Sequence, residues 1–118
     1  MRIKDAVGAY GEHVAAQYLT RAGYIILARN WRCPDGEIDI VAMDGPTVVV
    51  CEVKTRSGSG FGSGLDAVTR EKAARLRSLG RRWLAEYGRP ETPLRFDVIA
   101  VPRSRRGLGD VEHVRGAF

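Results

Sequence analysis

Two β-rich runs joined by a short turn constrain the fold most strongly. Residues 37–43 (EIDIVAM) and 47–56 (TVVVCEVKTR) flank the turn-forming residues Asp44-Gly45-Pro46. This composition is typical of two antiparallel strands in a hairpin. Three charged residues interrupt the apolar pattern of these runs: Asp39, Glu52 and Lys54. We therefore expect a hairpin that carries an unusual group of charges.

Strand periodicity decides whether these charges can meet. Alternate side chains of a strand share a face, so Glu52 and Lys54 lie together, and an even-numbered hairpin loop puts Asp39 on the same face. We expect a two-residue loop to place Asp39 opposite Val50, and a four-residue loop around Gly45-Pro46 to place it opposite Glu52. Direct or diagonal neighbours are about 4.5–8 Å apart, a distance that one divalent cation can bridge.

The chemistry of the three side chains favours a metal-assisted reaction. Neighbouring carboxylates repel each other and lose hydration, and Mg²⁺ relieves both costs because it prefers oxygen ligands. A protonated Lys54 can orient a water molecule or stabilise charge on a phosphate. The alternative is that Glu52 and Lys54 are solvated charges at a strand end, while Asp39 pairs with an arginine. Charges within β-branched strands break the local pattern, which favours a site.

The rest of the chain predicts helices around a sheet. Apolar spacing indicates an amphipathic helix over residues 4–22, and a second helix over 70–87 that is capped by Thr69 and ends at Gly88. Its apolar stripe includes Trp83 and Tyr87. Further strands are expected over residues 24–32 and 94–101, with a short one over 113–118. The order α-β-β-β-α-β predicts an α/β fold with a mixed sheet flanked by helices, and 118 residues suit a single domain, 1–118.

The charge balance favours a polyanionic partner. The chain has 19 Lys and Arg against 14 Asp and Glu, for a net charge of +5. Basic residues that could contact phosphates follow the hairpin and line the second helix: Arg56, Arg70, Lys72, Arg75, Arg77, Arg81 and Arg82. The plainer interpretation is a solvated helix face.

Two further segments could contribute to binding. The Gly/Ser-rich segment 57–64 could be a flap in which Phe61 stacks on a base, or a simple connector. A second basic cluster is formed by Arg103, Arg105 and Arg106.

Several classes of protein are disfavoured. Cys33 and Cys51 have neither zinc-ligand spacing nor a disulfide pattern, and Cys51 is expected in the core. We expect His13 and His113 at the surface, because neither has a nucleophile nearby in the sequence. No stretch approaches the ~18 apolar residues of a membrane span, so we expect a cytoplasmic protein without a membrane partner.

The hairpin resembles a known nuclease core. Residues 36–42 (GEIDIVA) followed by 48–56 (VVVCEVKTR) match the Asp-then-ExK order of the PD-(D/E)XK superfamily. Further segments extend the resemblance over nearly the whole chain: Gly11-Glu12, Phe61-Gly62, Ala67-Val68-Thr69 and Phe96-Asp97-Val98. Together they look like the YraN-like family of uncharacterised bacterial proteins.

The resemblance implies a restriction-endonuclease-like fold near the Holliday-junction-resolvase branch. It implies that Asp39 and Glu52 bind Mg²⁺ or Mn²⁺, that the Val53 carbonyl joins the metal shell, and that Lys54 is the catalytic lysine. In resolvase-like members a glutamate on the first helix also contributes to the catalytic site, and Glu12 matches that position. Its place at the flank of the apolar stripe suits a solvated glutamate equally well.

Two functions follow as hypotheses. The first is a metal-dependent endonuclease that hydrolyses phosphodiester bonds of DNA, which we favour over RNA, with branched or single-stranded DNA as candidate substrates. The second is a non-catalytic module that keeps the nuclease fold and binds nucleic acid or other proteins. Because resolvase-like enzymes often act in pairs, a homodimer is one expected arrangement.

Overall fold

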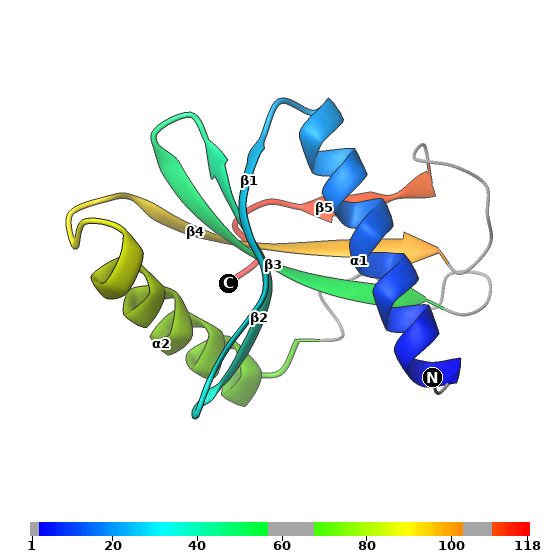
Figure 1. Cartoon of the computed structure of the whole chain (residues 1–118), viewed down its shortest axis with the longest axis horizontal. Coiled ribbons are helices and arrows are strands. Elements are labelled where there is room, and N and C mark those ends of the chain that lie inside the picture. Colours follow the sequence, from blue (N-terminus) through cyan, green and yellow to red (C-terminus); the bar gives the residue numbers. More distant parts are fainter. Residues whose placement is uncertain (1–2, 57–67, 103–109) are drawn as a thin grey trace.

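In the described part of the chain, the fold is a five-stranded sheet with two helices (Figure 1). The computed structural model describes residues 3–56, 68–102 and 110–118. Its elements follow in the order α1 (Ile3–Arg21), β1 (Ile25–Cys33), β2 (Gly36–Asp44), β3 (Thr47–Arg56), α2 (Arg70–Tyr87), β4 (Leu94–Pro102) and β5 (Glu112–Val114). The expected α/β class and order are confirmed, and the short last strand begins at Glu112 and ends at Val114.

The sheet is mixed, in the spatial order β1-β2-β3-β4-β5. β3 and β4 are parallel, whereas the other neighbouring strands are antiparallel. Parallel neighbours need a crossover connection, and α2 lies within it. The strand that carries Glu52 and Lys54 is therefore central in the sheet, with β2 on one side and β4 on the other.

Each helix packs its own apolar cluster against one face of the sheet. Leu19 of α1 packs in a cluster with Val49 and Cys51, while Trp83 of α2 packs in a cluster with Val50. Because successive strand residues point to opposite faces, α1 and α2 cover opposite faces. Both sides of β3 are buried, which explains its run of apolar residues and the buried position of Cys51.

The β2–β3 hairpin closes through two residues, Gly45 and Pro46. Asp44 pairs with Thr47 on either side of them, and Gly45 has a φ of 57°, which glycine adopts without strain. Asp39 is as far from Asp44 as Glu52 is from Thr47, so the two carboxylates are in register. Our expectation that a two-residue loop pairs Asp39 with Val50 is wrong, because the turn is centred on Gly45-Pro46 and Val50 pairs with Val41.

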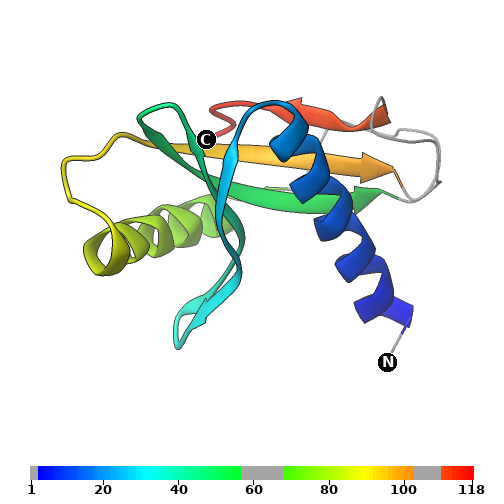
Figure 2. The same cartoon turned by 45° about the horizontal axis from the view of Figure 1, so that its top comes forward.

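β2 leaves β3 just beyond this point. The paired residues of β2 and β3 end at Ile40 and Cys51, while β2 continues alongside β1 to its start at Gly36. Ile40 packs in the cluster beneath α1, but Ile38 packs in the cluster beneath α2, so the strand twists at Asp39. In Figures 1 and 2 the far end of the β1–β2 hairpin projects from the sheet between the two helices.

Helix α2 begins and ends as predicted. The Thr69 hydroxyl oxygen accepts a hydrogen bond from the Lys72 backbone N–H at 3.1 Å, and the Gly88 N–H donates to the Leu84 carbonyl at 2.8 Å. Tyr87, expected in the apolar stripe, is 59% exposed, and its ring contacts that of Trp83 at 5.4 Å between centroids.

Two expectations fall on residues outside the described part of the chain: the Phe61 flap, and the cluster of Arg103, Arg105 and Arg106. Within the part that the structure describes, neither helix is long and apolar enough to cross a membrane.

Candidate active site

Asp39 lies where β2 and β3 separate. Its Oδ2 accepts a hydrogen bond from the Val53 backbone N–H at 2.8 Å, so the side chain links the two strands just beyond their last paired residues. This contact replaces the arginine partner that the alternative interpretation required of Asp39. The carboxylate is half-buried and fixed beside β3.

Asp39 sits in an environment that disfavours its ionised form. Burial is the largest cause, and together with the neighbouring Glu52 charge it raises the pKa of Asp39 to about 7. The Val53 N–H opposes the shift, while the negative charge of Glu12 adds to it. Carboxyl groups from α1 and β3 therefore both affect the ionisation of Asp39 on β2.

Glu52 is buried next to two lysines. Its side chain is 9% exposed, and its Oε1 lies 3.1 Å from Lys72 Nζ and 3.9 Å from Lys54 Nζ. Burial contradicts the interpretation of Glu52 as a solvated charge at a strand end. Since an unpaired buried carboxylate is costly, the lysines compensate its charge.

The two lysines also affect each other. Burial and the contact with Lys72 lower the pKa of Lys54. Burial alone would lower the pKa of Lys72 as well, but its contact with Lys54 and the charge of Glu52 outweigh that effect and raise it. Of the two, Lys54 gives up its proton more readily.

Glu12 reaches the site from α1. It is buried, 8% exposed, so it is not an ordinary solvated glutamate. Burial raises its pKa against the opposing charge of Arg29, whose Nε lies 3.6 Å from Glu12 Oε1. The neighbouring Gly11 permits this placement, because a methyl group at position 11 would overlap the Thr55 hydroxyl of β3.

The cleft beside Asp39 opens on both sides. On the α1 side, a pocket of about 500 Å³ is lined by Glu12, Asp39, Val53 and Thr55, among others. On the α2 side, a pocket of about 270 Å³ is lined by Asp39, Glu52, Lys72 and Arg75, among others. Asp39 belongs to both pockets, so ligands could approach it from either helix.

The residues present suit a divalent cation in part. Among the described residues, Glu12 Oε1 is buried without a hydrogen-bond partner, although Arg29 Nε lies 3.6 Å from it. Burial and the neighbouring Glu52 charge raise the pKa of Asp39, and a cation would offset both effects. However, within residues 3–56, 68–102 and 110–118 no three His, Cys, Asp or Glu side chains form a ready-made ligand cluster. A cation held by Asp39 and Glu52 would therefore need backbone or water ligands, which Mg²⁺ accepts readily.

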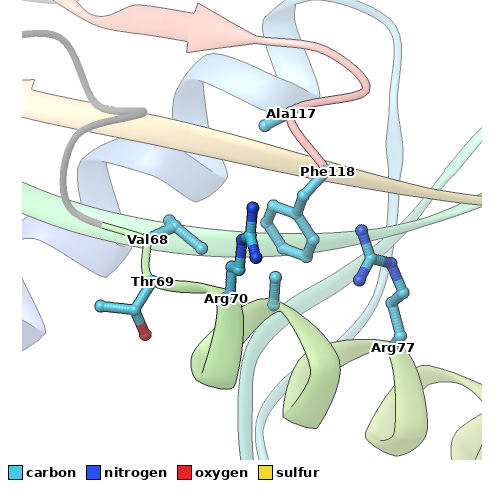
Figure 3. Close-up of a pocket in the computed structure, with 7 residues that line it drawn as sticks. Val68, Thr69, Arg70, Arg77, Ala117 and Phe118 are labelled. Carbon is cyan, nitrogen blue, oxygen red and sulfur yellow. The ribbon is translucent and has the colours of Figure 1, made fainter.

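The expected nucleic-acid contacts divide between two sides of α2. Lys72 and Arg75 line the pocket with Glu52, whereas Arg70 and Arg77 line another pocket with Phe118. Figure 3 shows Arg70 and Arg77 on either side of the Phe118 ring, with the Arg77 guanidinium 5.7 Å from its centroid. The side chain of Arg56 lies outside the described part. Of these expected nucleic-acid contacts, Lys72 and Arg75 are thus the ones placed beside the candidate site.

Sequence reasoning missed Asn30, which also lines the Glu12–Asp39 pocket. Asn30 lies between two pairs of the β1–β2 ladder, Arg29 with Ile40 and Trp31 with Ile38, which places it across from Asp39. Its φ is 52°, a conformation that asparagine tolerates better than most residues. An asparagine within an expected strand was the available signal.

A second missed feature is a buried polar network around Asp97. Asp97 is fully buried and accepts hydrogen bonds from Arg95 Nε at 2.9 Å and from the Gly116 backbone N–H at 3.0 Å. His113 Nε2 lies 2.7 Å from Asp97 Oδ2, with a side chain only 4% exposed. The expectation of His113 at the surface is wrong, because β5 places the His113 ring against the buried Asp97 carboxylate.

Comparison with known proteins identifies the family. The model of "Uncharacterised protein family UPF0102" matches residues 11–101. The chain belongs to this family. A UPF0102 protein of Parafrankia sp. (strain EAN1pec) is 59% identical over the full length of both chains. One from Beutenbergia cavernae is 57% identical over 98% of both, and one from Streptomyces coelicolor is 51% identical over 98% of this chain and 91% of its own. The expected YraN-like family is thereby confirmed.

Proposed function

We propose that this UPF0102 protein is a metal-dependent nuclease of the PD-(D/E)XK type that hydrolyses phosphodiester bonds of DNA. The observation that carries the proposal is the register of the β2–β3 hairpin, which places Asp39 level with a buried Glu52 where the strands separate. Lys54 follows on the same strand face, 3.9 Å from Glu52. Two carboxylates and a lysine thus meet beside open pockets.

Each residue has a role in this proposal. Asp39 and Glu52 would hold Mg²⁺ or Mn²⁺, with the Val53 carbonyl as a further ligand and Glu12 as a nearby carboxylate. When bound, the cation would activate a water molecule and polarise the phosphoryl oxygen. The Lys54 ammonium would orient that water or stabilise negative charge on the phosphate. Lys72 and Arg75 line the neighbouring pocket, where they could contact the DNA backbone.

Cleavage of labelled DNA tests the proposal. Linear, flapped and four-way DNA would be incubated with the protein and either Mg²⁺, Mn²⁺ or a chelator. We expect cleavage only with metal, and a loss of at least about 100-fold in Asp39→Asn and Lys54→Met, in line with removal of an electrostatic catalytic group. Cleavage that survives chelation, or that is unchanged in both variants, would overturn the proposal.

A second candidate function is nucleic-acid binding without cleavage. It is favoured by the incomplete ligand cluster among the described residues and by the basic side chains on both sides of α2. Binding of labelled DNA between 50 and 200 mM salt distinguishes it. Affinity with a steep salt dependence but no product with either metal would favour this function.

Pairing of two copies remains a prediction. The outer strand β1 exposes Ile25 and Leu27, at 65% and 42%, on a sheet edge that could meet another chain. Sedimentation of the protein with and without four-way DNA tests whether a homodimer forms.

A further inference from the structure

Among the described residues, Lys72 has the cationic group closest to the proposed metal ligand Glu52. Its Nζ lies 3.1 Å from Glu52 Oε1, compared with 3.9 Å for Lys54 Nζ from the same oxygen. The Glu52 side chain is 9% exposed, so water can compensate little of its charge. Among the described residues, Lys72 therefore supplies the nearest positive charge to this buried carboxylate.

A divalent cation at Glu52 would compete with this contact. An ammonium group and a metal ion that share one carboxylate oxygen lie only a few ångströms apart, where like charges repel strongly in a partly buried site. Lys72 is better placed than Lys54 to move away. It extends from α2 and its side chain is 36% exposed, whereas that of Lys54 is 25% exposed and arises from the central strand β3.

We propose that Lys72 is a resident cation that neutralises Glu52 in the metal-free protein and is exchanged for a divalent metal ion when the site is loaded. This inference rests on the proposed metal site. Lys72 acts through Glu52, so it is a positioning residue. The exchange keeps the site assembled without metal, and it releases the Lys72 ammonium on loading, beside the pocket where a DNA phosphate would lie.

Calorimetric titration with Mn²⁺ in the absence of DNA tests the exchange. Because Lys72→Met removes the competing charge, we expect Mn²⁺ to bind that variant on the order of tenfold more tightly than the original protein. Arg75→Met is the matched control, since Arg75 lines the same pocket and has no ion-pair partner within the described ranges. We expect its Mn²⁺ affinity to stay within about twofold of the original. Lys72→Arg keeps a cation and should not gain affinity.

Thermal unfolding gives a second readout. Without metal, Lys72→Met should unfold at a lower temperature, because Glu52 loses its closest partner. Saturating Mn²⁺ should then raise its unfolding temperature by more than it raises that of the original protein. Lys72→Gln, which keeps a hydrogen-bond donor without the charge, repeats both tests if Lys72→Met does not fold.

The outcomes separate this inference from the proposed function. If the original protein binds Mn²⁺ and the uncharged variants bind it equally or less tightly, the exchange is wrong while the metal site stands. If Mn²⁺ binds to neither the original protein nor the uncharged variants, the metal site itself is wrong, and the exchange with it. If Lys72→Met binds Mn²⁺ more tightly than the original protein, and adding Asp39→Asn to that variant abolishes the binding, both the exchange and the metal site are supported.

Discussion

The Val53 backbone N–H donates a hydrogen bond to Asp39 Oδ2 at 2.8 Å, immediately beyond the last paired residues of β2 and β3. The strands separate here, yet this bond keeps Asp39 beside the residue that follows Glu52. The bond fixes the carboxylate in a setting where burial and the charge of Glu52 favour protonation. Geometry and proton binding are therefore coupled at the candidate site.

This coupling predicts how Asp39→Asn changes stability with pH in the absence of metal. The pKa of Asp39 is raised from an ordinary 3.8 to about 7, so the native state holds a proton that the unfolded state has lost. The free energy of unfolding of the original protein should therefore fall as pH rises from about 4 to about 7. The asparagine variant has no carboxyl group to lose a proton, so its free energy of unfolding should rise relative to that of the original protein over this range. Urea denaturation at pH 5 and pH 8 with a chelator measures it; an equal difference at both pH values would contradict the shift.

Gly11→Ala should displace α1 from β3. An added methyl group would meet the Thr55 hydroxyl, and the overlap should cost about 1–3 kcal/mol, which exceeds the gain of up to about 1 kcal/mol in helix propensity. Gly8→Ala is the matched control, because a methyl group there has open space. Guanidinium denaturation should show a loss for Gly11→Ala and none for Gly8→Ala. Equal effects would mean that close approach at Gly11 does not fix the position of Glu12.

Asn30 allows backbone conformation and side-chain chemistry to be tested separately. Asn30→Gly removes the amide but accepts a φ of 52°, whereas Asn30→Ala should cost about 1 kcal/mol more because alanine is strained there. If the amide helps to position groups in the Glu12–Asp39 pocket, both variants should lose metal affinity, although only Asn30→Ala loses much stability. Full metal affinity in Asn30→Gly would restrict Asn30 to a backbone role.

Asp97 should be essential for stability rather than for reaction. Its pKa is lowered to about 2: burial opposes ionisation, but the hydrogen bonds from His113, Arg95 and Gly116 prevail. Its contribution should be present above about pH 4 and lost as pH falls toward 2. Asp97→Asn should cost about 3–5 kcal/mol at pH 7, because it breaks a buried charge network. Asp44→Asn, at the exposed end of the Arg95 contacts, should lose less; an equal loss would contradict a central role for Asp97.

The sequence predicted the elements because local signals were strong. The Thr69 cap, the glycines that end both helices and the β-branched run of β3 each specify local conformation. The alternation of side chains along a strand likewise predicted that Asp39, Glu52 and Lys54 share a face for an even-numbered loop. The sequence did not show which residues form the centre of the turn.

Other features depend on contacts between distant segments. The twist at Asp39 moves Ile38 and Ile40 into different clusters, which simple alternation cannot anticipate. Lys72 carries no sequence signal for pairing with Glu52, because the pairing depends on how α2 packs on the sheet. Burial of His113 likewise requires β5 to lie beside β4. Charge patterns along one element do not reveal such partners.

The position of a bound metal ion decides whether Asp39 and Glu52 form a metal centre. A crystal of the protein soaked in Mn²⁺ and measured for anomalous scattering would locate the ion. We expect one strong peak between the Asp39 and Glu52 carboxylates, at about 2.0–2.3 Å from an oxygen of each, and no such peak in Asp39→Asn. A Mn²⁺ peak elsewhere, or none at saturating metal while Lys72 remains on Glu52, would contradict a metal-dependent nuclease centre at these residues.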